Sequence, residues 1–405
     1  MISHASRLWR TVPLCCLAAA AEGFDIQSMG VAAPGMAPAL HLTRTQLGPA
    51  FSASTLGLLI GAVVVGLLAD RIGRKGALAG SLAVFGAFTL ATPWAGSVGM
   101  LLLIRLAAGV GLGGAMPNLM ALSAESAAEE RRATFVAISA AAMPLGGAVA
   151  SGVAAALDWR AIFVVGGLGP IALAAVMAAV LPESERFLAA RRRSSGGAAA
   201  PTLFAALFGG GRWAASAYLW TAAFAALLTL FLLLNWLPIL MTAKGVSRAA
   251  AAVVALAFNV GGSMGALAIA TLFRGPKRGT TLAAWFLGMA VSVVMLAGVP
   301  ARLDLAAAAG FAAGFFVSST PTALYALAPD FYAVEMRATG LGAVVGVGRI
   351  GAILGPLLAA ALLTGGASAA TVLLALPPFV VVAAAATFLV LIRRARMIEP
   401  ATAAA

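Results

Sequence analysis

The chain has 405 residues, of which 62% are hydrophobic and only 10% are charged. Soluble domains carry about 25% charged residues, so this composition excludes a soluble globular protein and predicts a polytopic membrane protein. The net charge of +13 does not indicate nucleic-acid binding, because so few charges leave no room for a basic face. Cys15 and Cys16 are adjacent, and His4 and His41 lie far apart, so we expect no disulfide framework, no metal site and no cofactor.

Twelve stretches are long and apolar enough to cross a bilayer, which takes about 20 residues in a helix. They are expected at about 12–37, 49–69, 77–96, 100–122, 134–156, 160–181, 214–240, 249–273, 280–299, 304–327, 339–364 and 370–392. The long segment 182–212 is charged and rich in serine and glycine, which predicts a linker loop. The fold class is therefore an all-α membrane protein with six-helix bundles at 1–181 and 213–405.

The two halves of the sequence also resemble each other. The segment 66–76 after the second span is similar to the segment 269–279 after the eighth span. An internal repeat of six spans is typical of transporters in which two related bundles hold the substrate between them, near the midplane of the membrane.

The orientation follows from the distribution of the 26 lysines and arginines. Most of them lie on loops that share a side with both termini and the linker, which the positive-inside rule places in the cytoplasm. We expect a multi-pass protein of the cytoplasmic (inner) membrane, in contact with the lipid bilayer. A cleaved signal peptide ending near Ala21 is the alternative for the N-terminal segment, and it would leave eleven spans.

Four charged residues lie inside predicted spans, where a charge is costly and indicates function. They are Glu22 and Asp25 in the first span, Arg105 in the fourth and Arg349 in the eleventh. Asp25 and Arg105 lie at similar depth, so a pair between them would offset the burial of both. Our hypothesis is that Asp25, with Glu22, carries a coupling proton while Arg349 or Arg105 binds a substrate carboxylate. Static ion pairs that hold the bundle together are the alternative.

Glycines four residues apart occur at Gly109 and Gly113, and again at Gly342 and Gly346. Stripes of small residues let membrane helices approach closely. We therefore expect close helix packing along both stripes.

The loop after the second span resembles the signature loop of the major facilitator superfamily, with Gly66, Asp70, Arg71, Gly73 and Arg74 at the matching positions. The run from Arg105 to Gly113 resembles that superfamily's motif in the fourth helix. This resemblance implies the major facilitator fold and alternating access. It also implies that the loop, with Glu125 and Arg337, forms a charge network that gates the conformational change.

A narrower resemblance connects the chain with the aromatic acid:proton symporter family. Three stretches carry it: Glu22-Gly23-Phe24-Asp25, the run from Gly113 to Asn118, and the run from Arg337 to Pro356. Asn235-Trp236-Leu237-Pro238 is similar as well. The resemblance implies that a small organic anion, an aromatic carboxylate such as a hydroxybenzoate, enters the cell with protons. It implies a transporter that is not an enzyme, and we expect it to work as a monomer.

The cavity between the bundles is expected to be lined by aromatic, amide and hydroxyl side chains, which suit a flat ring with a polar tail. The candidates are Phe24, Asn118, Asn235, Trp236, Tyr325, Ser319 and Thr320. Ordinary helix packing is the alternative role for each of them. A proton-coupled efflux antiporter of the same fold is the alternative function, although the segment 143–147 matches the antiporter motif only loosely.

Overall fold

The structure is a computed structural model of the whole chain. It describes residues 4–126, 132–184, 187, 213–273, 278–332 and 336–402. Within these ranges all regular secondary structure is helical. The predicted linker lies almost entirely outside the described residues, so the predicted domain limits remain predictions.

Six long helices make up the N-terminal bundle. They are α1 (His4–Ala39), α2 (Arg44–Ile72), α3 (Arg74–Ala91), α4 (Val98–Ser126), α5 (Arg132–Ala156) and α6 (Trp159–Val180), with a short 3-10 turn, η1 (Thr92–Trp94), after α3. A capping box of Thr43 and Gln46 begins α2, and the side chain of Asp158 caps α6. These polar caps accept backbone N–H groups at the N-terminus of each helix, so each helix begins directly after a short loop.

The C-terminal bundle repeats this pattern with two interrupted spans. Its helices are α9 (Trp213–Ala243), α10 (Arg248–Leu272), α11 (Arg278–Gly298), α12 (Leu303–Ala313), α13 (Thr320–Leu327), α14 (Arg337–Thr364), α15 (Ala369–Leu374) and α16 (Pro377–Thr402). A π-helical turn, η4 (Gly314–Ser318), joins α12 to α13, and a 3-10 turn, η5 (Ala328–Asp330), follows α13. α15 and α16 together form the last span.

Ten spans among the described residues are long and apolar enough to cross a membrane, and α5 contributes a shorter apolar stretch, Ala141–Ala156. With α1, which is not among those ten, the described residues form twelve membrane helices, and the predicted fold class is confirmed. α1 is longer than the predicted span at both ends because it accommodates Pro13, Pro34 and Pro38 within one helix.

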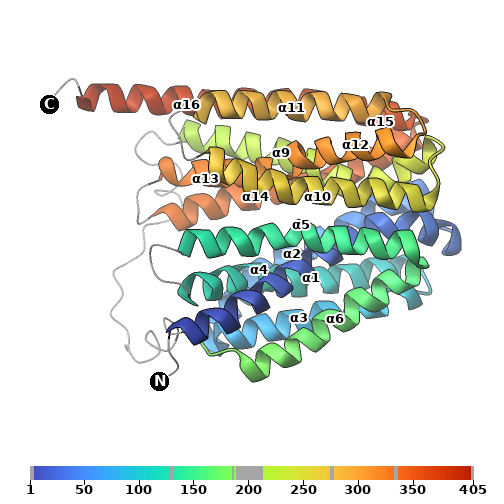
Figure 1. Cartoon of the computed structure of the whole chain (residues 1–405), viewed down its shortest axis with the longest axis horizontal. Helices are drawn as coiled ribbons and strands as arrows, with labels where there is room; N and C mark the ends of the chain where they lie inside the picture. The colour runs from blue at the N-terminus through green and yellow to red at the C-terminus, as the bar shows by residue number, and fades with distance from the viewer. Residues whose placement is uncertain are drawn as a thin grey trace.

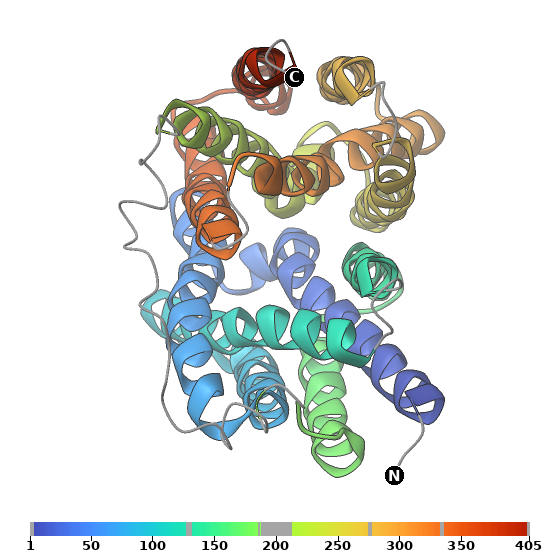
Figure 2. The ribbon, with the colours of Figure 1, turned by 90° about the vertical axis from the view of Figure 1, so that its left-hand side faces the viewer.

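The two bundles lie side by side, and both chain termini are at the same end of the molecule (Figure 1). Figure 2 looks along the helices from that end and shows the N-terminal bundle, blue to green, below the C-terminal bundle. We call this the terminal end and the opposite one the far end. Cys15, Ala18 and Ala19 are fully buried, so the segment before Glu22 belongs to the packed core of the N-terminal bundle.

Glycines allow α2 and α4 to touch along their backbones. A Cβ atom at Gly109 would collide with the carbonyl of Ser54, and one at Gly113 would collide with that of Leu58. The predicted stripe on α4 is therefore a packing surface. A Cβ atom at Gly342 or Gly346 would meet no neighbouring atom within 4 Å, so the second predicted stripe does not pack in this conformation.

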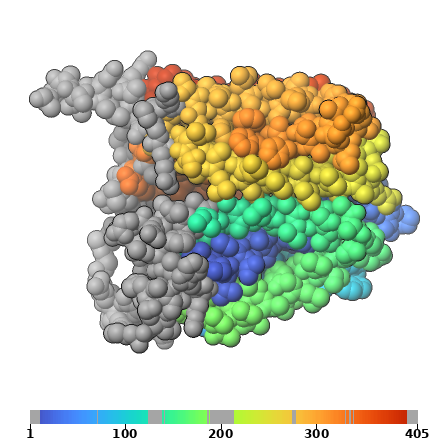
Figure 3. Space-filling view, viewed as in Figure 1, coloured from blue at the N-terminus to red at the C-terminus, as the bar shows by residue number. Residues whose placement is uncertain are grey.

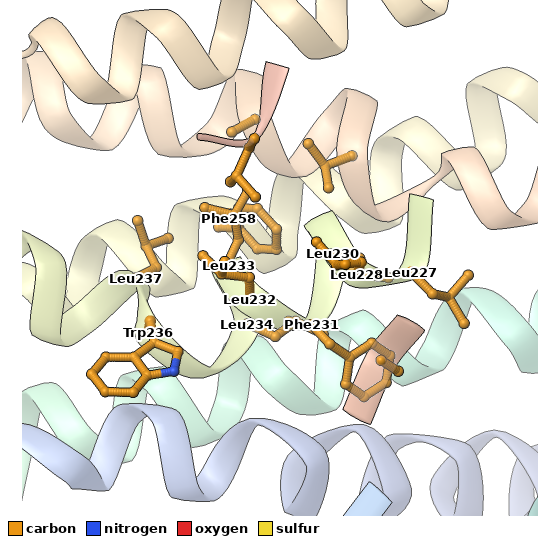
Figure 4. Close-up of a cluster of buried hydrophobic side chains, with 14 of the residues drawn as sticks. Leu227, Leu228, Leu230, Phe231, Leu232, Leu233, Leu234, Trp236, Leu237 and Phe258 are labelled. Carbon is orange, nitrogen blue, oxygen red and sulfur yellow. The ribbon is translucent and has the colours of Figure 1, made fainter. Parts of the chain in front are cut away.

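α9 is the most deeply buried helix among the candidate spans. Its apolar side chains enter one continuous core that includes residues of both bundles. Figure 4 shows this cluster, in which Phe258 from α10 lies against the leucines of α9. Trp236 is fully buried and packs edge-on against Phe51 of α2, with 5.3 Å between the ring centroids.

The bundles meet closely where α2 and α14 cross at the far end. The side chain of Ser52 donates a hydrogen bond to the carbonyl of Ile353 (2.7 Å), and the hydroxyls of Thr45 and Thr364 lie 3.3 Å apart. The same helix faces continue toward the terminal end, because residues seven apart share a face. There Val63 is 61% exposed, and a Cβ atom at Gly346 would meet no neighbouring atom within 4 Å. The crossing of α2 and α14 is therefore closed at the far end and open at the terminal end.

Large apolar side chains cover the outer surface. Leu67, Leu103 and Leu287 are each about two-thirds exposed. Figure 3 shows one such face, formed by α5, α6 and α10, with α1 visible between α5 and α6. Apolar surface on this scale requires a lipid environment rather than water.

Candidate functional site

α1 crosses the core beside the interface between the bundles and presents different faces to different neighbours. Ile26 and Met29 line a cavity between the bundles. Glu22 lies on the same stripe, because residues spaced i, i+4 and i+7 share a helix face. Asp25 lies at the edge of this stripe, four residues before Met29, and its carboxylate meets Thr89 of α3 and Arg105 of α4. The two acids of the motif therefore differ in their partners, because Asp25 accepts hydrogen bonds and Glu22 accepts none from the described residues.

The carboxylate of Asp25 forms a bidentate ion pair with Arg105. The guanidinium Nη1 donates to Oδ1 at 3.2 Å and Nη2 donates to Oδ2 at 2.8 Å. The hydroxyl of Thr89 donates a further hydrogen bond to Oδ1. Arg105 is 1% exposed and Asp25 is fully buried. The pairing expected from their similar depths is thus present, and it lies within the N-terminal bundle.

A buried pair of this kind is stable only because each charge satisfies the other. Removing one partner of a buried ion pair typically costs about 3–5 kcal/mol, since an uncompensated charge remains in the core. The backbone carbonyl of Arg105 also accepts a hydrogen bond from Ser54 of α2 (3.2 Å). The pair therefore ties α1, α3 and α4 together beside the cavity.

Glu22 has no such support. It is fully buried, and neither oxygen of its carboxylate has a hydrogen-bond partner. It interacts electrostatically with Arg349 of α14 and with Asp25. An isolated ionised carboxylate is costly in a low-dielectric interior, so Glu22 depends on the charge that Arg349 brings from the other bundle.

Arg349 is a half-buried cation of the C-terminal bundle. Its Cζ lies 5.9 Å from the ring centroid of Phe231, and its Nε has no hydrogen-bond partner. None of the ion pairs among the described residues involves Arg349, although Tyr325 and Glu22 interact with it electrostatically. Its guanidinium is therefore available to an incoming carboxylate.

The central cavity lies between α1, α2 and α4 on one side and α9 on the other. Its walls are formed by Ile26, Met29, Phe51, Ser54, Thr55, Leu58, Arg105, Leu112, Phe231 and Asn235. Its volume is about 10 Å³, and a cavity of that size holds roughly one water molecule. An aromatic ring needs more room, so the bundles must separate at this level before the site accepts a ligand.

Asn235, Trp236 and Tyr325 were all expected at the cavity. Asn235 lines it, while its amide nitrogen donates to the carbonyl of Phe231 (2.8 Å). Trp236 instead donates its indole N–H to the carbonyl of Pro356 (3.1 Å) and is fully buried. Tyr325 is half-buried beside Arg349. Asn235 and Tyr325 therefore remain candidates for ligand contact, and Trp236 joins α9 to α14.

Phe24 and Asn118 do not line the central cavity. The ring of Phe24 packs against Gly166 of α6 and borders an apolar groove of about 290 Å³ on the outer face, between α5 and α6. Asn118 donates its amide N–H to the carbonyl of Gly114 within α4. The spacing of these residues in the motifs did not reveal which way each side chain points.

Ser319 and Thr320 directly follow the π-helical turn in the tenth span, where α13 begins. The indole N–H of Trp285 donates to the hydroxyl of Ser319 (2.9 Å). The hydroxyls of Ser319 and Thr320 donate in turn to the carbonyls of Phe315 and Phe316. Because these bonds satisfy carbonyls freed by the π turn, both residues are internal to the C-terminal bundle in this conformation.

The gating residues lie at the terminal end. Gly73 separates α2 from α3 with a φ of +93°, a conformation that favours glycine. Arg71 is exposed, Arg74 is half-buried, and Gly66 has open space around it. Arg337 is exposed at the start of α14, and its Nε donates to the carbonyl of Tyr332 (3.3 Å). The side chains of Asp70 and Glu125 lie outside the described part of the structure, so the predicted network among them stays a prediction.

Three functional contacts were missed by sequence reasoning. The hydroxyl of Thr89 completes the shell of Asp25. Glu183 accepts the backbone N–H of Lys75 (3.1 Å) at the start of α3. Gln27 donates to the carbonyl of Leu234 across the interface between the bundles (3.0 Å). A polar residue in the middle of an apolar span was the available signal for Thr89 and Gln27.

The family is decided by comparison with known proteins. The family model of the Major Facilitator Superfamily matches residues 15–301. The chain belongs to this superfamily. It is 42% identical over 360 residues to the 3-(3-hydroxy-phenyl)propionate transporter of Escherichia coli strain K12, covering 88% of this chain and 87% of that protein.

Other members of the superfamily are similar as well. The gallate transporter of Pseudomonas putida is 34% identical and the 4-hydroxybenzoate transporter PcaK of the same species is 33% identical; each comparison covers 86% of this chain and 84% of the relative. These relatives confirm the predicted resemblance to transporters of aromatic acids, and the chain is a transporter rather than an enzyme.

Solved structures agree with the fold. The inward-open xylose transporter XylE of E. coli superposes with a TM-score of 0.74 at 16% identity, covering 94% of this chain and 95% of that one. A bacterial homologue of the human lysosomal transporter Spinster, in an inward-facing unoccupied conformation, gives 0.72 at 18% identity, with 95% and 97% covered. At these identities the likeness shows the fold alone.

Proposed function

We propose that this transporter takes up an aromatic carboxylate together with a proton by alternating access. The observation that carries the proposal is Arg349, a cation beside the central cavity to which no carboxylate of the described residues is paired. Arginine binds carboxylates with two parallel hydrogen bonds. The relatives that transport hydroxyphenylpropionate, hydroxybenzoate and gallate support an aromatic acid as the substrate.

The remaining walls of the site suit a ring. Phe231 and Phe51 provide aromatic surface, and Asn235, Ser54 and Thr55 provide a few polar groups. Sites for small molecules are mostly apolar with a small number of polar anchors. The carboxylate would bind Arg349 while the ring lies between α2 and α9.

We place the transporter in the cytoplasmic membrane, with both termini in the cytoplasm, because most of the basic residues lie at the terminal end. In that orientation the structure is open to the cytoplasm and closed to the outside. The proposed driving force is the proton gradient, without a cofactor, and the proposed functional unit is a monomer.

The test is uptake into proteoliposomes of the purified full-length protein, with the outside made more acidic than the inside. The panel is 3-(3-hydroxyphenyl)propionate, 4-hydroxybenzoate, gallate and the amide of each acid. We expect uptake of at least one acid, faster with the pH gradient, and no uptake of its amide. The variant Arg349→Gln should lower kcat/KM by about tenfold or more, which corresponds to losing about 1.4 kcal/mol of binding.

Arg302→Gln is the matched control, because Arg302 is exposed and pairs only with Asp304 among the described residues. Its uptake should equal that of the unaltered protein. Uptake of no aromatic acid would contradict the proposal. Proton-driven export of cationic drugs by the same proteoliposomes would favour the antiporter alternative.

A further inference from the structure

The guanidinium of Arg105 has one N–H group that the ion pair with Asp25 does not use. Both Nη atoms donate to the carboxylate of Asp25, whereas Nε has no hydrogen-bond partner among the described residues. The residue is only 1% exposed. A buried donor without a partner is costly and rare in native structures, so each one calls for an explanation.

This unused donor belongs to a wall of the central cavity. Arg105 lines the cavity together with Thr55 of α2 and Asn235 of α9. Asn235 bonds to the carbonyl of Phe231 through its amide nitrogen, and its amide oxygen remains as an acceptor. The cavity volume of about 10 Å³ suits one water-sized group. The walls therefore offer a donor and acceptors around the space of a single oxygen atom.

The chemistry of this pocket suits a neutral group better than a carboxylate. The arginine cation and the Asp25 anion cancel, and both Nη atoms of Arg105 are already engaged. The two parallel bonds that arginine offers to a carboxylate are therefore taken. A hydroxyl group can both accept a hydrogen bond and donate one. It would satisfy the Nε–H of Arg105 and the amide oxygen of Asn235 together.

Arg105 and Arg349 lie at similar depths on two sides of α2. Ser54 of α2 bonds to the carbonyl of Arg105, and Ser52 bonds to that of Ile353. Ser54 lies about 3 Å closer to the terminal end than Ser52, and Arg349 lies one turn, about 6 Å, closer to it than Ile353. The two arginines therefore differ in depth by only about 3 Å.

The ring of Phe231 connects the two arginines. It forms part of the cavity wall, and the Cζ of Arg349 lies 5.9 Å from its centroid. In Figure 4 this ring lies on the opposite side of α9 from Phe258. A substrate whose carboxylate binds Arg349 would place its aromatic ring beside Phe231 and the distal edge of that ring toward Arg105.

We propose that the central cavity is a subsite for the ring hydroxyl group of a hydroxylated aromatic acid. The hydroxyl oxygen accepts the Nε–H of Arg105, and the hydroxyl hydrogen is donated to the amide oxygen of Asn235. These two residues belong to different bundles, so the hydroxyl group bridges the bundles when they close around the substrate. The inference rests on the proposed uptake of aromatic carboxylates and narrows it to acids that carry a ring hydroxyl.

The test measures kcat/KM for the uptake of two acids by the full-length protein in proteoliposomes. The acids are 3-(3-hydroxyphenyl)propionate and 3-phenylpropionate, which differ only in the hydroxyl group. We expect the unaltered protein to prefer the first by about tenfold or more, because the second leaves buried polar groups unpaired. The preference should largely disappear in Arg105→Lys, which keeps a cation for Asp25 without an Nε–H, and in Asn235→Ala.

Asn259→Ala is the matched control. Asn259 is buried in α10 and donates its amide N–H to the carbonyl of Ala255 (2.8 Å), as Asn235 does to that of Phe231. The described walls of the cavity do not include it, so its variant should keep the preference. Arg349→Gln should slow the uptake of both acids by the same factor, because it removes the carboxylate anchor that they share.

The preference is a ratio within each variant, so it does not depend on how much of that variant is folded. Equal kcat/KM for the two acids in the unaltered protein would overturn the hydroxyl subsite and leave the proposed uptake of aromatic carboxylates intact. A preference that survives in Asn235→Ala and in Arg105→Lys would overturn the subsite as well. Uptake of neither acid would contradict the proposed function itself.

A binding measurement separates the subsite from transport. The probe is 3-ethylphenol, which has the ring and the hydroxyl group but no carboxylate, and its Kd is measured by NMR on the protein purified in detergent. The Kd should rise about tenfold in Asn235→Ala and stay unchanged in Arg349→Gln and Asn259→Ala. A Kd that rises in Arg349→Gln and not in Asn235→Ala would refute the assignment.

Discussion

A single hydroxyl group completes the shell of hydrogen bonds around Asp25. Thr89 belongs to α3, while the other two bonds come from Arg105 on α4. Hydrogen bonds to charged groups contribute about 1.5–3 kcal/mol, more than bonds between neutral groups. The position of Thr89 therefore affects the stability of the whole N-terminal bundle.

We predict that Thr89→Val lowers the free energy of unfolding by about 1.5–3 kcal/mol, because it removes the donor and keeps the shape. The measurement is the thermal unfolding midpoint of the protein purified in detergent. Thr89→Ser is the control, since it keeps the hydroxyl and should lose less. Equal losses in the two variants would show that the methyl group, and not the hydrogen bond, matters.

At the scale of helices, the start of α3 is stabilised by Glu183, an acid that follows α6 and so lies more than 100 residues later in the chain. Gly73 ends α2 and precedes α3, and Glu183 follows α6. Its carboxylate accepts the N–H groups of Lys75 and Ser184. Carboxylates at helix N-termini are favoured because the first N–H groups lack partners and the helix dipole is positive there.

We predict that Glu183→Gln destabilises the loop between α2 and α3 and lowers the free energy of unfolding by about 0.3–1 kcal/mol. Faster amide hydrogen exchange at residues 73–77 is the direct readout. Asp304→Asn is the matched control, because Asp304 pairs with an exposed arginine and surface pairs contribute little. Unchanged exchange at residues 73–77 in Glu183→Gln would contradict the capping role.

Hydropathy located the membrane helices well, since each needs a long apolar run and ends near a charge or a cap. The depth of Asp25 and Arg105 along their helices was enough to predict their pairing. The direction of side chains was not predictable, because it depends on the rotation of each helix. Phe24 faces α6 instead of the cavity, and Ser319 bonds to the carbonyls of the π turn instead of lining the cavity.

For the molecule as a whole, the contact between α2 and α14 at the far end decides which side of the site is open. Ser52 bonds to Ile353, and Thr45 and Thr364 are within hydrogen-bond distance. At the terminal end the same faces are apart, with Val63 exposed and Gly346 in open space. Transport requires this contact to break and the terminal end to close.

We predict that a disulfide between Thr45→Cys and Thr364→Cys, in a background with Cys15→Ala and Cys16→Ala, stops transport. The two hydroxyl oxygens, whose places the thiol sulfurs would take, are 3.3 Å apart, and a disulfide brings two sulfurs to about 2 Å. Uptake should fall by about tenfold or more under oxidation, because the far end can no longer open. It should recover with a reductant.

The two single-cysteine variants are the controls, and oxidation should leave their uptake unchanged. Mass spectrometry of the double variant verifies that the cross-link has formed. Undiminished uptake with the cross-link intact would mean that the far-end contact does not open during the transport cycle.

The pairing of Asp25 with Arg105 also bears on how the chain enters the membrane during synthesis. α1 contains two acids and is not among the spans that are apolar enough by composition. Its first compensating charge is Arg105 on α4, which leaves the ribosome after α2 and α3. α1 must therefore stay with the insertion machinery, or in a hydrated pocket beside it, until α4 arrives. Glu22 stays without a compensating charge for longer, because Arg349 belongs to α14 and is synthesised near the end of the chain.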